Sequence, residues 1–217
     1  MKVLDRFRPT DLEAIREAVA EAELSTSGEI VTYIVGESDD YPEAGWRGAG
    51  IGALAGLGCG VAAHAWSEVW ASPVTWLVAS TLFGFVVGWL LGTRVPPIRR
   101  GLVRSDLLTH RVSQRAETAF LEEEVFDTEE RTGILIFVAL FEHRVIVLGD
   151  RGINSAVEQD EWNGIVARMV EHLRRGEIAE GVLLGVGECG QLLEHRGVQI
   201  RPDDRNELSN EPRLRDR

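Results

Sequence analysis

The chain of 217 residues contains a single lysine, Lys2, and only two cysteines. Cys59 and Cys189 are too far apart in the sequence to form a metal-ligand spacing or a disulfide framework. So few cysteines are typical of a reducing, cytoplasmic compartment. The first residues also lack the apolar stretch of a secretory signal, so we expect no cleaved signal peptide.

The chain also has fewer basic residues than acidic ones. Its formal net charge is -12, which argues against nucleic acid as a partner and against broad adhesion to anionic lipid. Common phosphatase signatures are missing from the sequence. We find no phosphocysteine loop, no Asp-x-Asp-x-Thr nucleophile motif and no glycine-rich phosphate loop. These motifs therefore give no support for an enzyme.

Lys, Arg and Asp are absent from one long stretch, residues 48–92, in which Glu68 is the only acidic residue. Its second half, 74–92, is a near-continuous apolar run of the length that a bilayer requires of a helix. The first half is equally poor in charge but rich in Gly and Ala. The sequence predicts a transmembrane helical hairpin at 48–93, and the alternative is a glycine-rich hairpin buried in a soluble core. Five of the six tryptophans, typical of membrane interfaces, lie in or beside it: Trp46, Trp66, Trp70, Trp76 and Trp89.

Small residues recur at every fourth position in both halves of this stretch. On a helix each set forms a smooth stripe that lets two backbones approach closely. A glycine zipper within one antiparallel hairpin is one interpretation, and self-association or contact with another membrane protein is the other. The two sets are Gly48, Gly52, Gly56, Gly60 and Ser80, Gly84, Gly88, Gly92.

Arginines flank the stretch on both sides, whereas its central turn carries only Glu68. Arg47 precedes it, and Arg94, Arg99, Arg100 and Arg104 follow it. Under the positive-inside rule, both chain ends then lie in the cytoplasm. We therefore expect a multi-pass protein of the bacterial cytoplasmic (inner) membrane with both termini inside.

The remaining sequence alternates between helical and strand patterns. A capping box at Thr10 opens the first helix, and the last two strands are close enough to form an antiparallel hairpin. We expect an α/β sandwich of two or three layers, built from 1–47 and 94–210 around the inserted 48–93, with a tail at 211–217. The sequence from Arg201 onward has little to bury and is expected to be extended or disordered at its end. Helices are predicted at 10–24, 105–126, 160–175 and 178–195, and strands at 29–35, 134–141 and 145–148.

Three segments, RTGILIF (131–137), HRVIVLGDRGI (143–153) and DDRNEL (203–208), resemble the TPM domain family. The family is named for a thylakoid lumen protein, a photosystem II protein and a nematode receptor-associated protein. The chain is most similar to its bacterial branch of membrane proteins, in which a transmembrane hairpin sits inside the domain. The resemblance implies a Rossmann-like α/β sandwich and association with membrane-protein complexes. For some plant members it also implies weak acid phosphatase activity and binding of divalent metal.

Carboxylates make the best candidate site. Asp150 ends a predicted strand, where ligand crevices of α/β sheets usually lie. Oxygen donors without His or Cys suit Ca²⁺ or Mg²⁺. Alternatively, Asp150 caps the turn before Gly152, the tail acids are solvated, and residues 206–208 dock on the core through Leu208. The predicted metal ligands are Asp150, Asp203, Asp204, Glu207 and Glu29.

Three functions remain open from the sequence. The first is an accessory protein that the hairpin anchors and whose domain binds another protein, assisting the assembly or maintenance of membrane complexes. The second is a divalent-metal-dependent phosphohydrolase that uses the acidic residues. The third is a hairpin that drives self-association and merely carries the domain.

Overall fold

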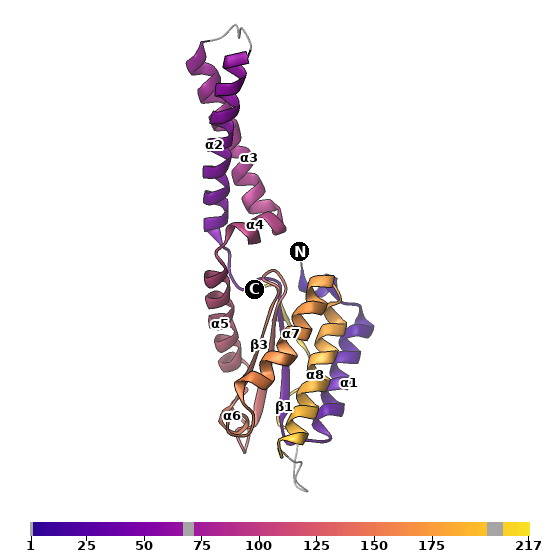
Figure 1. Cartoon of the computed structure of the whole chain (residues 1–217). Helices are drawn as coiled ribbons and strands as arrows, with labels where there is room; N and C mark the ends of the chain where they lie inside the picture. Colours follow the sequence, from indigo (N-terminus) through magenta and orange to yellow (C-terminus); the bar gives the residue numbers. More distant parts are fainter. Residues whose placement is uncertain (1, 67–71, 199–205) are drawn as a thin grey trace. The chain divides into compact units, whose positions relative to one another are not determined.

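The computed structural model describes residues 2–66, 72–198 and 206–217. The chain divides into two compact units, which are residues 1–38 with 109–217, and residues 39–108. The first unit is an α/β domain and the second is a helical hairpin (Figure 1). Each is described by itself.

A four-stranded sheet in the order β3-β2-β1-β4 forms the centre of the α/β domain. β1 runs parallel to β2 and β4, and β2 and β3 form the expected antiparallel hairpin. Every residue of β1 and β2 is buried, which explains why both read as continuous apolar runs. The strands are Glu29–Val35 (β1), Gly133–Ala139 (β2), Arg144–Gly149 (β3) and Arg213–Arg215 (β4).

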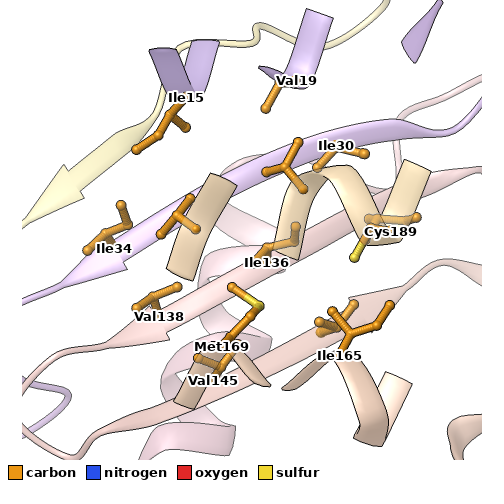
Figure 2. Packing of buried hydrophobic residues seen from close by; sticks show 14 of the residues in the cluster. Ile15, Val19, Ile30, Ile34, Ile136, Val138, Val145, Ile165, Met169 and Cys189 are labelled. Carbon is orange, nitrogen blue, oxygen red and sulfur yellow. The ribbon is translucent and has the colours of Figure 1, made fainter. Parts of the chain in front are cut away.

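Helices cover both faces of this sheet, so the sandwich has three layers. One face packs against α1 (Pro9–Glu23), α7 (Gln159–Arg175) and α8 (Ile178–His195), and Figure 2 shows the apolar side chains that meet there. The other face packs against α5 (Ser105–Glu122). Alternate residues of β1, β2 and β3 face the two cores. Ile34 thus faces the three helices, while Tyr33 stacks on Phe137 on the α5 side, with ring centroids 5.6 Å apart.

Several element ends differ from the sequence prediction. α1 begins at Pro9, and its capping box joins Arg8 to Asp11, so the box predicted at Thr10 is wrong. Helix α6 (Arg151–Ala156) replaces the predicted turn, with Asp150 as its N-cap. α5 ends four residues before the predicted position. α7 ends as expected at Gly176, whose φ of 82° suits glycine. A short 3₁₀ helix, η1, covers Val3–Arg6.

The carboxyl-terminal residues have more to bury than the sequence suggested. Leu214 packs against the core on the side of α1, and Leu208 packs against the core on the side of α5. β4 pairs with β1 along Tyr33–Val35. The tail is therefore extended, as expected, but it forms an edge strand of the sheet.

The hairpin unit contains α2 (Pro42–Trp66), α3 (Pro73–Arg94) and α4 (Pro96–Leu102). α2 starts at Pro42, six residues before the predicted hairpin, and α4 starts at Pro96, beyond its predicted end at residue 93. Proline fits the first turn of a helix, where its missing N–H has no intrahelical partner. Small residues line the contact between α2 and α3. A Cβ added at Gly52 would lie 2.1 Å from the carbonyl oxygen of Gly84, so the backbones touch.

Candidate functional site

The predicted acidic site lies at the edge of the sheet where β1 and β2 begin. Glu29 pairs with Gly133, and the backbone N–H of Asp150 donates to the carbonyl of Gly133 at 2.8 Å. The backbones of Glu29 and Asp150 are therefore two strand spacings apart, about 10 Å. Because β3 is antiparallel to β2, Asp150 lies at the amino-terminal edge of the parallel strands. Ligand crevices form at the opposite, carboxyl edge, so that part of the sequence argument was wrong.

Asp150 is engaged by two groups of the chain itself. One carboxylate oxygen accepts the N–H of Arg151 at 2.7 Å, which caps α6. The other forms an ion pair with Nε of Arg131 at 2.9 Å. The Arg131 guanidinium also stacks over the ring of Phe126. A cation at Asp150 would have to displace this arginine, and the capping role considered as the alternative is the one the geometry supports.

Glu29 brings the carboxyl-terminal segment to this edge. Its carboxylate, 5% exposed, accepts the backbone N–H groups of Glu207 and Leu208, each at 3.2 Å. The carboxylate of Glu207 in turn accepts the N–H of Glu129 at 3.1 Å. Two of the five predicted ligands, Glu29 and Glu207, are thus in contact. The Glu29 carboxylate, however, binds backbone amides and so docks residues 206–208 on the domain.

Glu23, at the end of α1, completes this docking site and was missed from the sequence. Its carboxylate accepts the N–H of Ile30 at 3.0 Å and the side-chain amide of Asn210 at 2.7 Å. Burial raises the pKa of Glu23 to about 7, and the nearby Glu29 carboxylate acts in the same direction, while these hydrogen bonds oppose the rise. No sequence motif identifies Glu23, because a glutamate at the end of a helix is usually exposed to solvent.

The described residues do not by themselves fit a divalent cation. Within the described ranges, no group of three or more His, Cys, Asp or Glu is placed to hold a metal ion. The oxygens of Glu29 and Asp150 already bind amides and an arginine. Asp203 and Asp204 lie outside the described residues, so the five-residue metal site stays a prediction.

A second buried carboxylate lies at the opposite edge of the sheet. Glu142, in the turn between β2 and β3, is 4% exposed and accepts the N–H of Ser38 at 2.7 Å. Ser38 follows the end of β1, where the chain leaves the α/β unit. This carboxylate therefore fixes the exit of β1.

The outer surface of the hairpin carries exposed large apolar side chains from both α2 and α3. α2 and α3 contain 25 and 22 residues, which correspond to about 37 and 33 Å at 1.5 Å per residue. Both are long and apolar enough to cross a membrane, by length and composition. Side chains more than half exposed include Ile51, Leu54, Val61, Val78, Leu82, Phe83 and Val86.

Comparison with known proteins agrees with this fold. Residues 103–192 match the model of the TPM domain. The NMR structure of the BA42 protein from the psychrophilic bacterium Bizionia argentinensis is similar, with a TM-score of 0.59 and 19% identity. The match covers 98% of this chain and 97% of that chain, and at this identity it shows a likeness of fold. No curated protein matches the chain.

Proposed function

We propose that this chain, whose residues 103–192 match the model of the TPM domain, is a membrane-anchored accessory protein whose domain binds another protein. The hairpin is the anchor. In the bacterial cytoplasmic membrane it crosses the bilayer twice and leaves the domain and both termini in the cytoplasm. The bound partner belongs to a membrane-protein complex that the protein helps to assemble or maintain.

One observation supports the anchoring role. The hairpin has small residues in the contact between its helices and large apolar side chains on its outer surface, which is the reverse of a water-soluble hairpin. Glycines fill the contact between α2 and α3, where Gly48, Gly52 and Gly56 lie against the backbone of α3. Large apolar side chains such as Leu54 and Phe83 point away from that contact and are 73% and 72% exposed. A soluble hairpin buries its large apolar residues, whereas membrane helices pack through small residues and turn large ones to lipid.

Charge supports the proposed orientation. Residues 48–92 contain no Lys or Arg, whereas arginines stand on both sides of this stretch. The positive-inside rule retains such flanks in the cytoplasm.

Alkaline carbonate extraction and thiol labelling test the anchor and its topology. We expect the full chain to stay in the membrane pellet. In a Cys59→Ala background, a membrane-impermeant thiol reagent should label Ser67→Cys in intact cells and Asp5→Cys only after lysis. Release by carbonate would contradict the anchor, and labelling of Asp5→Cys in intact cells would contradict the topology.

The accessory role is tested separately, by deleting the gene and resolving membrane complexes after gentle detergent extraction. We expect at least one complex to lose abundance or subunits, and re-expression of the full chain to restore it. An unchanged set of complexes would count against the accessory role while leaving the anchor intact.

A divalent-metal-dependent phosphohydrolase is the alternative proposal. It is supported by the meeting of Glu29 with the segment that carries Glu207, and opposed by the pairing of Asp150 with Arg131. Calcium and magnesium titration of the purified full chain, followed by hydrolysis of a model phosphate ester, tests it. Metal-stimulated turnover that Asp150→Asn and Glu207→Gln abolish would favour the enzyme, and turnover no higher than a buffer blank would exclude it.

A further inference from the structure

Tryptophans lie near both ends of the hairpin, whereas arginines lie only at its open end, where the chain enters and leaves it. Trp66 and Trp76 stand near the turn, and Trp46 and Trp89 stand near the open end. Contacts between the helices set the level of the open end: a Cβ on Gly45 would touch Thr93 and Trp89, and one on Gly48 would touch Gly88. Arg47 and Arg94 therefore lie at about the level of the open-end tryptophans, where headgroups lie if the helices cross a bilayer.

Arg99 and Arg47 form contacts at this end that hold the hairpin together. Arg99 donates to the carbonyl of Asp40 and places its guanidinium 5.9 Å from the ring centre of Tyr41. Arg47 donates to the carbonyl of Leu102 at 2.7 Å, at the end of α4. These contacts join the segment that enters the hairpin to the segment that leaves it. A guanidinium bound to a carbonyl keeps its full charge, because a carbonyl carries none.

Arg94 is placed differently. It ends α3, is exposed, and forms no ion pair with any residue within 2–66, 72–198 and 206–217. Arg104 provides the contrast, since it pairs with Asp106 at 2.8 Å. The open end therefore presents two cationic groups, Arg47 and Arg94, that no described carboxylate neutralises.

We propose that Arg47 and Arg94 bind the phosphate groups of anionic phospholipids, so that the hairpin gathers such lipids around its open end. The inference rests on the proposed membrane anchor and names the lipid class that the anchor selects. A guanidinium binds phosphate through paired N–H donors. Near a membrane surface, each arginine favours anionic lipid by a factor of about five. The selection is local, since the whole chain is acidic.

Native mass spectrometry of the full chain from nanodiscs tests the proposal. The discs contain phosphatidylcholine with a minor share of phosphatidylglycerol, and the lipids that stay bound are counted. We expect phosphatidylglycerol to be enriched on the wild-type chain. Arg94→Gln should lower this enrichment about fivefold, and Arg94→Lys should restore part of it. Arg104→Gln removes the same charge ten residues away and should change nothing, because Asp106 already neutralises that charge.

The outcomes separate this inference from the anchor on which it rests. A chain that fails to enter nanodiscs contradicts the anchor. A chain that enters but retains both lipids in their bulk ratio contradicts the lipid site alone. So does an equal loss in Arg94→Gln and Arg104→Gln, which would indicate a response to net charge. Equally tight binding of inorganic phosphate without lipid would overturn the assignment to a bilayer lipid.

Discussion

At the end of α1, Glu23 holds a half-buried carboxylate against the start of β1 and against Asn210 of the tail. Burial raises its pKa from 4.5 to about 7. The folded domain therefore holds this proton more tightly than the unfolded chain does. Its contribution to the free energy of unfolding is fully present below about pH 4.5 and is lost as the pH rises to about 7.

We expect the urea midpoint of the domain to fall between about pH 5 and pH 7.5. Glu23→Gln should flatten this fall, because an amide does not titrate. Glu21→Gln, an exposed site on the same helix, is the matched control and should keep the wild-type slope. If both variants show the same slope, Glu23 does not cause the pH dependence.

Asp150 combines a helix cap with an ion pair, and two substitutions separate these roles. Asparagine still caps a helix but cannot pair with Arg131, whereas alanine does neither. We expect Asp150→Ala to lower the free energy of unfolding by about 1 kcal/mol more than Asp150→Asn does. Urea denaturation measures both. Equal effects would mean that the cap contributes nothing.

Among the elements, α2 and α3 depend on particular glycines. At Gly52 and Gly84 an added Cβ would lie 2.1 Å from the facing backbone carbonyl, whereas at Gly50 and Gly58 it would meet nothing within 4 Å. A backbone atom cannot move aside as a side chain can. Gly52→Ala and Gly84→Ala must therefore push the helices apart.

These variants form a matched set for one measurement, the SDS-induced loss of helicity of the purified full chain. We expect Gly52→Ala and Gly84→Ala to unfold at lower SDS than the wild type. Gly50→Ala and Gly58→Ala should unfold at the same or higher SDS, because alanine favours a helix over glycine by about 1 kcal/mol. A uniform response of all four would show that helix propensity, and not close packing, decides stability.

The elements predicted well from the sequence are those whose signal is local. α8 has its predicted limits, and α7 differs from its prediction only by starting one residue early. Both helices could be predicted because their amphipathic spacing and the glycine at 176 are local features of the sequence. β4 was missed because a three-residue strand has no period and its partner, β1, is remote in sequence. Asp150 was placed at a strand end correctly. The direction of β3 and the position of Arg131 beside Asp150 depend on how the strands pair, which residue spacing in the sequence does not reveal.

For the whole molecule, the two apolar cores decide what the domain needs in order to fold. Both cores are assembled from residues of 1–38 and 109–217. No residue within 39–66 or 72–108 belongs to either core. Since burial of apolar surface is the dominant favourable term in folding, the domain should fold without the hairpin.

Replacing residues 42–102 by a short Gly-Ser linker tests this independence and the anchor together. We expect the shortened chain to move from the membrane pellet to the soluble fraction, to show the circular dichroism of a mixed α/β protein, and to unfold cooperatively. Introducing Glu23→Gln into it should flatten the pH dependence as in the full chain, which shows that the tail still docks on Glu23. A shortened chain that remains in the pellet as folded protein would reveal a second membrane contact on the domain. One that is unfolded would mean that the hairpin organises the domain as well as anchoring it.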